Sequence, residues 1–171
     1  AIGAMARTNI DLMGRIYLLS DSIYIGRFDF NQDGTYEHDI GSFANLKFSN
    51  GRFLADNSVS WDDKWVGEIG SYMFYVGIVV DTGYSTLVGE NNFEVTNITF
   101  DNVEFDCNFV TGANWVENSH RTIFNKNSYY NLGVACRFIG SPQSVDSTRG
   151  YIAVNQQLMI TYNRFEGNLR N

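Results

Sequence analysis

The chain of 171 residues is 44% hydrophobic and 15% aromatic, and it carries a formal net charge of −7. Its length predicts a single domain with a sizeable core, while the excess of acids without any basic cluster argues against nucleic-acid binding. No apolar run approaches the roughly 18 residues of a membrane-spanning helix. Asn, Phe and Tyr are common and helix-favouring residues are sparse, so the composition predicts a protein built almost entirely of β-strands.

Short strands separated by polar turns are predicted along the whole chain, because apolar and polar residues alternate with period two. Residues 1–15 form a lead-in, and we treat residues 1–171 as one domain that belongs to a longer chain or to an assembly. The predicted strands are residues 16–19, 23–30, 43–53, 72–81, 95–108, 121–130, 132–139 and 151–165. The predicted loops are residues 31–34, 58–70, 83–92, 111–119 and 141–150.

The clearest pattern lies in residues 95–108, VTNITFDNVEFDCN. Ile98 and Phe100 fall on one side of a strand, and after Asn102 the alternation restarts with Val103 and Phe105. This predicts a strand, a polar corner and a second strand. Related phrases are NLKFSNGRF and ITYNRF, so the same local structure is expected to recur.

Inward-pointing residues recur at a nearly fixed interval along the chain. Most gaps between them measure 24 to 27 residues, and the last measures 36. A fixed period of this size is typical of stacked architectures in which each turn of chain covers its neighbour. The residues in this series are Phe28, Phe53, Ile78, Phe105, Tyr129 and Phe165.

The segments ITFDNVEFDCN, LKFSNGRF and LMITYNRFEGN resemble the coils of right-handed parallel β-helix proteins of the pectate-lyase-like superfamily. That superfamily includes polysaccharide lyases, glycoside hydrolases and bacteriophage tailspikes. The resemblance implies an all-β parallel β-helix with Asn50, Asn102 and Asn163 at its corners, where stacked Asn side chains satisfy turn backbone groups. A β-sandwich or jelly roll is the alternative fold. The paired-Asp and Arg-x-Lys motifs of the polygalacturonase-type enzymes are missing.

Glu104 and Asp106 are the candidate catalytic residues. As i and i+2 on one strand they share a face, about 6.5 to 7 Å apart along the backbone. This spacing lies near the range of roughly 6.5 to 9.5 Å for the two carboxyl groups of inverting glycosidases. The alternative is a solvated outer face whose charges keep the sheet soluble.

Candidate sugar-binding residues lie in polar segments. An exposed indole beside acids and amides is a typical platform for a sugar ring, and the alternative is that each Trp plugs its loop or contacts a neighbouring subunit. A lone His can act as a base but is more commonly structural. The candidates are Trp61, Asp62, Asp63, Trp65, Trp115 and His120.

No metal or cofactor site is predicted. Cys107 and Cys136 lie in apolar contexts, and they are interpreted as buried thiols or, on neighbouring coils, as a disulfide pair. Asn31 to Gly34 resembles the start of a calcium loop, but the downstream acidic ligand is missing, so it is interpreted as a turn.

We expect an extracellular or virion-surface protein of the tailspike or adhesin type, which binds a polysaccharide in an outer groove. Whether it also cleaves the polymer is left open. The resemblance favours a homotrimer, with no nucleic acid and no membrane span as partners. The alternatives are a structural assembly protein without sugar chemistry and a free-standing polysaccharide lyase or hydrolase. These expectations depend on fold analogy combined with the Trp and acidic residues.

Overall fold

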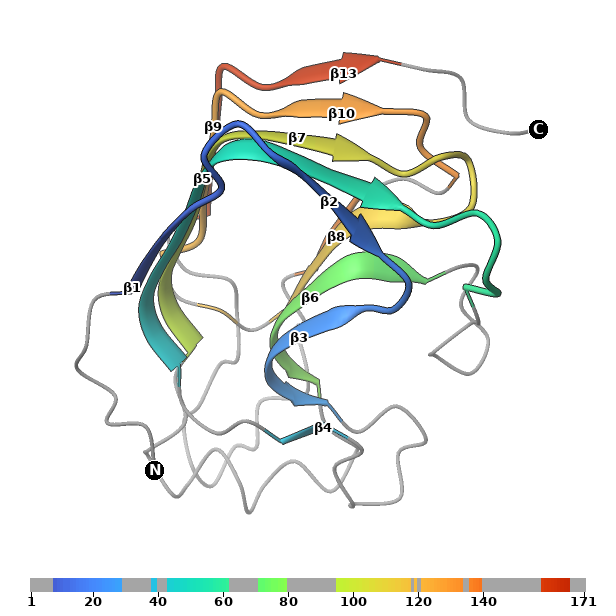
Figure 1. Ribbon diagram of the computed structural model, residues 1–171. Coiled ribbons are helices and arrows are strands. Elements are labelled where there is room, and N and C mark those ends of the chain that lie inside the picture. Colours follow the sequence, from blue (N-terminus) through green and yellow to red (C-terminus); the bar gives the residue numbers. More distant parts are fainter. Residues whose placement is uncertain are drawn as a thin grey trace.

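The computed structural model describes residues 8–28, 38–39, 43–61, 71–79, 95–117, 119, 121–133, 136–139 and 158–166. The secondary structure of these residues consists of β-strands alone (Figure 1). Consequently, the described chain has no helix that is long and apolar enough to cross a membrane. The prediction of an all-β protein is confirmed.

The strands belong to two sheets. Sheet A contains β1 (Thr8–Asp11), β2 (Ile16–Leu19), β5 (Phe43–Ala55), β7 (Val95–Asp106), β9 (Ile123–Asn125), β10 (Ser128–Tyr130), β12 (Met159–Thr161) and β13 (Arg164–Glu166). Sheet B contains β3 (Ile23–Phe28), β4 (His38–Asp39), β6 (Tyr72–Val79), β8 (Gly112–Glu117) and β11 (Arg137–Ile139).

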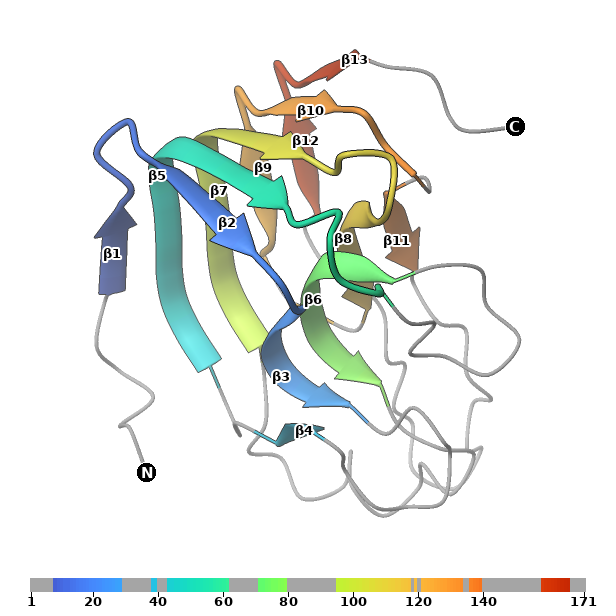
Figure 2. The same ribbon diagram turned by 45° about the vertical axis from the view of Figure 1, so that its right-hand side comes forward.

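The described chain crosses between the two sheets repeatedly, as Figures 1 and 2 show. Each return to sheet A adds a strand beside the previous one, and we call each such passage a rung. The five rungs are β1 with β2, then β5, β7, β9 with β10, and β12 with β13. All pairings among the described strands are parallel except that of β3 with β4.

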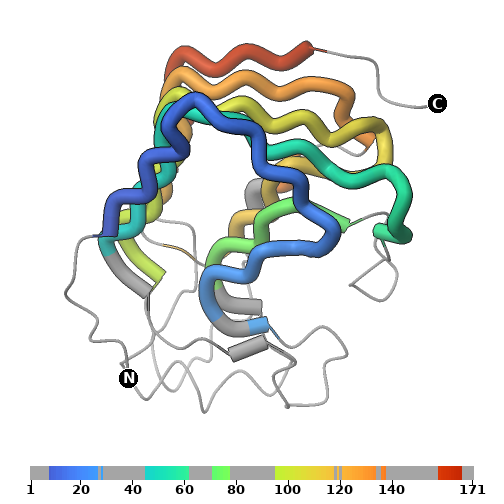
Figure 3. Tube along the Cα trace, viewed as in Figure 1, coloured from blue at the N-terminus to red at the C-terminus, as the bar shows by residue number. Residues whose placement is uncertain are grey.

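The rungs of sheet A bend at the same place, which gives the sheet its L-shaped outline (Figure 3). Asn50 and Asn102 occupy this corner with φ values of 57° and 56°, in the left-handed region that Asn tolerates better than most residues. The Asn102 Nδ2 donates to the Asn50 Oδ1 at 3.1 Å, so the two corners are also joined by their side chains. The predicted corners at Asn50 and Asn102 are confirmed.

Asn163 also lies in a corner, between β12 and β13, as predicted, but it is offset by one residue from the position that Asn50 and Asn102 occupy. Tyr162 and Lys126 hold the left-handed φ values of 55° and 56° in the last two rungs. Asn163 and Asn127 follow them and bond to backbone groups of the neighbouring rung. Where the strand ladder is interrupted by the corner, backbone groups need side-chain partners, and these Asn side chains supply them.

Asn127 shows this role most fully. Its side chain is buried, and its Nδ2 donates to the Phe100 carbonyl at 3.0 Å. Its Oδ1 accepts from the Val103 N–H at 2.9 Å. Asn163 repeats the pattern one rung later, donating to the Phe124 carbonyl at 2.8 Å.

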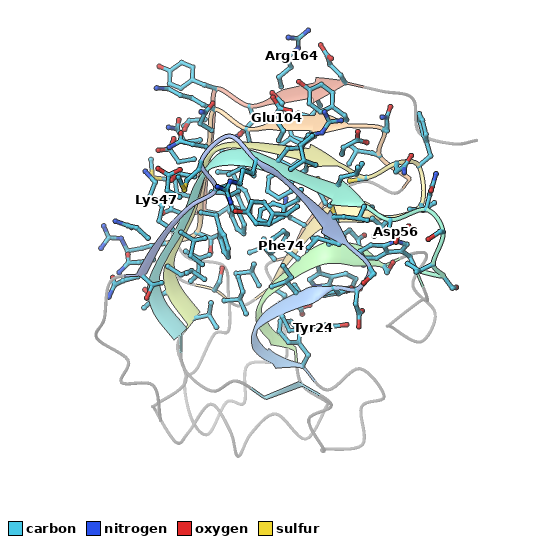
Figure 4. The ribbon with its side chains drawn as sticks, viewed as in Figure 1. Tyr24, Lys47, Asp56, Phe74, Glu104 and Arg164 are labelled. Atoms are coloured by element: carbon cyan, nitrogen blue, oxygen red, sulfur yellow. The ribbon has the colours of Figure 1, made fainter. Side chains whose placement is uncertain are left out.

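Two ladders of side chains fill the inner side of sheet A. Neighbouring rings within them stack with centroids 4.5 to 6.1 Å apart. Phe74 of sheet B packs edge-on against both ladders and lies between the sheets (Figure 4). By register, the first inner ladder is Ile10, Phe48, Phe100, Phe124 and Ile160, and the second is Tyr17, Phe53, Phe105, Tyr129 and Phe165.

The predicted series is correct in four members, Phe53, Phe105, Tyr129 and Phe165, which share the second inner ladder. It is wrong at Phe28 and Ile78, which belong to β3 and β6 of sheet B. The turns of chain differ in length, since register partners in the second inner ladder lie 36, 52, 24 and 36 residues apart. The 25-residue steps from Phe28 to Phe53 and on to Ile78 therefore lead from one sheet to the other and not from one rung to the next.

Phe100→Ala is expected to lower the free energy of unfolding by about 3–5 kcal/mol. Phe100 is fully buried and stacks on Phe48 and Phe124 with both centroid distances at 5.2 Å. Phe165→Ala is the matched control, because Phe165 is 52% exposed. Urea denaturation at low protein concentration measures both, and equal losses would contradict the described core.

Asn127→Ala is expected to lower the free energy of unfolding by about 2–3 kcal/mol, because it leaves the Val103 N–H and the Phe100 carbonyl buried without a partner. Asn125→Ala is the control: Asn125 bonds to Asp101 on the outer side and is only partly buried. Asn125→Ala should lower the free energy of unfolding by less than about 1 kcal/mol. A cost for Asn127→Ala no larger than that of the control would rule out the corner role.

Candidate functional site

The two predicted catalytic carboxylates lie on the outer face of sheet A beside an arginine. Arg52 of β5 is the register partner of Glu104 in β7. Its Nη2 donates to the Oδ2 of Asp106, and its Nε lies 4.0 Å from the Oε2 of Glu104. The side chains of Glu104 and Asp106 thus meet at one guanidinium, from a residue more than 50 positions earlier in the chain.

The two carboxylates differ in their accessibility. The Oδ1 of Asp106 accepts from the Asn131 Nδ2 at 3.0 Å and from the Asn108 N–H at 3.1 Å, and its Oδ2 accepts from Arg52. Its side chain is 8% exposed, whereas that of Glu104 is 49% exposed and points outward in Figure 4. A water-activating base needs a free oxygen, so the geometry favours a structural role for Asp106.

The row of polar side chains continues across sheet A. Tyr130 of β10 is the register partner of Asp106, and its ring centroid lies 5.9 Å from the Arg52 guanidinium carbon. In the last rung Arg164 and Glu166 form an ion pair on the same face. We call this row the polar strip, and its members are Arg52, Glu104, Asp106, Ser128, Tyr130, Arg164 and Glu166.

A second polar row lies on the other arm of the L. The Lys47 Nζ donates to the Asp101 Oδ2 at 2.6 Å, and the Asn125 Nδ2 donates to the Asp101 Oδ1 at 2.9 Å. The Thr161 hydroxyl extends the row by donating to Asn125 at 3.0 Å. The bond from Lys47 lowers the pKa of Asp101 below its ordinary value, with a smaller contribution from Asn125.

Trp61 and Trp115 are the predicted sugar platforms that the structure describes. Trp61 is half-buried against the core, and its Nε1 donates to the Asp56 carbonyl at 2.8 Å. Trp115 is 2% exposed and lies in β8, so its prediction as part of a polar loop is wrong. Its segment is buried because β8 is a central strand between β6 and β11, and such strands need no alternating pattern.

Four of the predicted binding residues lie outside the described residues. These are Asp62, Asp63, Trp65 and His120.

Sequence reasoning missed a row of aromatic side chains on the outer face of sheet B. Tyr24 and Tyr75 stack with centroids 5.1 Å apart, and Tyr75 lies 6.0 Å from Trp115. The Arg137 guanidinium carbon lies 4.6 Å from the Trp115 ring centroid. These residues are register partners on β3, β6, β8 and β11. They lie 51, 40 and 22 residues apart in the chain, so no fixed interval in the sequence could have found them.

Glu117 is a buried acid beside this row. The Trp115 Nε1 donates to its Oε2 at 3.0 Å. Burial raises the pKa of Glu117 from its ordinary value of 4.5 to about 7, and the bond from Trp115 opposes that shift. A carboxyl of this kind can hold or release a proton near neutral pH. It is only 7% exposed, so a substrate has little access to it.

No group of three or more His, Cys, Asp or Glu residues in the described chain could hold a metal ion. Both cysteines are free thiols, so they do not form the disulfide that the sequence left open. Burial raises the pKa of both, that of Cys136 to about 11.

Comparison with protein-family models found no match. Comparisons with curated proteins and with solved structures found no similar protein either.

Stability is expected to fall as pH rises from about 4.5 to about 7, because the folded state retains a proton on Glu117 that the unfolded state releases. In Glu117→Gln the free energy of unfolding should lack this pH-dependent component. At pH 8 it should exceed that of the wild type by on the order of 2–3 kcal/mol. Urea denaturation of both proteins at pH 5 and pH 8 measures the effect, since other groups cancel in the difference. Equal changes in both proteins would contradict the assignment.

Proposed function

We propose that the chain is a right-handed parallel β-helix protein of the pectate-lyase-like type, and that it binds a polysaccharide along the polar strip. Three features support the fold: parallel strands that alternate between two sheets, corner Asn residues, and inner ladders that run through the rungs. The alternative β-sandwich is favoured less, because sandwich sheets are built mainly from antiparallel pairs.

The polar strip carries the functional proposal. It places charged and hydroxyl groups on neighbouring strands, which are spaced by about 4.8 Å, so similar hydrogen-bonding groups recur along one direction. Glu104 and Arg164 are exposed and point outward (Figure 4), and Tyr130 is half-buried between them. Such a row fits a repeating polymer, because carboxylates and guanidinium groups bond to sugar hydroxyls and an aromatic ring stacks on a sugar face.

The net charge of the polar strip limits which polysaccharides could bind to it. Three acids stand against two arginines, and both arginines are already paired with acids. A strongly anionic polysaccharide would meet net negative charge here. A neutral or cationic polysaccharide is therefore the class that the strip suits.

Binding without cleavage is the activity that the geometry favours. Both oxygens of Asp106 accept hydrogen bonds from protein donors, so Asp106 is a positioning residue for Arg52 in this proposal. Glu104 would then bond to sugar hydroxyls as an acceptor. The extracellular or virion-surface location and the homotrimer stay predictions from the resemblance.

A polysaccharide array with the wild-type chain tests the binding proposal. Glu104→Ala and Arg164→Ala should each weaken binding of the bound polymer by about tenfold, as expected for a hydrogen bond to a charged group. Lys47→Ala is the control, because it removes an exposed charge from an ion pair outside the polar strip. No polymer bound, or equal losses in all three variants, would overturn the proposal.

Release of reducing ends from the bound polymer tests the absence of cleavage. The proposal expects none. Release that is lost in Glu104→Gln would show that Glu104 has a catalytic role and would restore the hydrolase alternative.

A further inference from the structure

The first rung of sheet A exposes apolar side chains at one edge of the sheet. On the described chain, β1 and β2 pair with β5 alone, so their other edge has no strand beside it. Single exposed apolar residues are ordinary, but these lie together on one edge. They are Ile10, Met13, Ile16, Tyr17 and Leu18, with exposed fractions between 37% and 70%.

The last rung also exposes apolar side chains, at the opposite edge of sheet A. Among the described strands, β12 pairs only with β9 and β13 only with β10. The tube in Figure 3 shows the first rung in blue at one side of the stack and the last in red at the other. The exposed apolar residues of this edge are Met159, Ile160, Tyr162 and Phe165, with exposed fractions between 45% and 85%.

The backbone of the last rung is also ready to pair. The Arg164 N–H donates to the Asn127 carbonyl at 2.8 Å, and the Glu166 carbonyl accepts from the Asn131 N–H at 3.2 Å. In a parallel ladder the residue between two such partners directs its own N–H and C=O to the other side. Phe165 therefore presents a donor and an acceptor at the open edge, which is a template for another strand.

The two edges match each other in register. Both inner ladders begin on the first rung, with Ile10 and Tyr17, and end on the last rung, with Ile160 and Phe165. Each end residue is a large apolar side chain that has a register partner on one side and no described strand on the other. Tyr129 and Phe165, for example, stack at 4.5 Å while Phe165 remains 52% exposed.

We propose that the last rung of one copy of this chain docks on the first rung of a second copy, head to tail, so that sheet A and both inner ladders continue across the junction. The contact would repeat the stacking that β7 already makes with β5 and that β13 makes with β10.

The charges at the junction are compatible with this docking. In the continued register Asp11 of one copy would face Thr161 of the other, and Glu166 would face Leu18. Like charges directly opposite each other would be destabilising, and the register contains none of them at these positions.

The association is open-ended. Two different edges meet, so each added copy leaves one free edge of each kind, and the assembly grows into a filament unless a rotation closes it. This differs from the closed homotrimer that the resemblance favours. The inference goes beyond the proposed polysaccharide binding and does not depend on it. Docking would use the backbone edges and inner ladders of the end rungs, whereas a polysaccharide would lie on the outer face, although Arg164 and Glu166 of the polar strip belong to the last rung.

The test blocks one edge at a time. Leu18→Glu blocks the first rung, because the new carboxylate would face Glu166 of the other copy, and Ile160→Lys blocks the last. Both side chains are exposed enough for the fold to tolerate a charge. In light scattering over a concentration series, the wild-type mass should rise beyond that of a dimer, and each variant alone should stay monomeric. An equimolar mixture of the two should form a dimer and nothing larger, since one intact edge of each kind remains.

Phe109→Lys is the matched control, because Phe109 is 40% exposed but lies in the corner after β7, away from both edges. It should assemble like the wild type. Circular dichroism checks the fold of each variant, and Met159→Lys replaces Ile160→Lys if the latter does not fold. A wild-type monomer at every concentration, a mass that stops at three copies, or a mixture that stays monomeric would overturn the proposal.

Discussion

The stacking of parallel strands in register is the constraint on which the rest of this molecule depends. Each rung of sheet A has to place the same kind of group at the same position as its neighbour, because a shift by one residue would turn every inner side chain outward. The inner ladders satisfy this requirement with rings that stack face to face, as Phe48, Phe100 and Phe124 do. This requirement for matching groups is hardest to satisfy at the corner, because the chain turns there and the strand ladder is interrupted.

Two solutions to the corner occur in one sheet. Asn50 and Asn102 adopt the left-handed conformation themselves and bond to each other side by side. In the later rungs Lys126 adopts that conformation, and Asn127 turns inward to pair the exposed backbone groups. Both solutions use the short amide side chain of Asn, which explains why this residue is so common in the sequence.

The same constraint shapes the outer face. Side chains in register on neighbouring strands lie only about 5 Å apart, so a charge on one rung needs an opposite charge or an amide on the next. Arg52 beside Glu104 and Asp106 meets this need, as does Lys47 beside Asp101. A pair of acids on an outer strand is therefore not by itself a sign of catalysis. Accessibility distinguishes the two carboxylates, and it favours Glu104 as the one that contacts a ligand.

Local patterns in the sequence were sufficient to predict most of the β-strands, though not β1, β4 or β8, and also the corners at Asn50 and Asn102 and the second inner ladder from Phe105 onward. They were insufficient wherever a residue's role depends on a distant rung. The partner of Asp106 is Arg52, 54 residues earlier, and no local pattern indicates that pairing.

Trp115 shows a different limit of sequence patterns. Its polar neighbours are typical of a loop, but its strand lies in the middle of sheet B, where both faces are covered. Position within the sheet, and not local polarity, decides its burial.

Cross-linking between neighbouring rungs tests the central claim of in-register parallel stacking most directly. With Cys107 and Cys136 replaced by Ala, the pair Glu104→Cys and Ser128→Cys joins register partners on β7 and β10. The pair Glu104→Cys and Tyr130→Cys is offset by two residues on the same face. Partners in register lie about 4.5–5.5 Å apart between Cβ atoms and the offset pair about 7–8 Å, so the account predicts faster oxidation of the first pair. Equal rates, or faster oxidation of the offset pair, would contradict the register and with it the stacked fold.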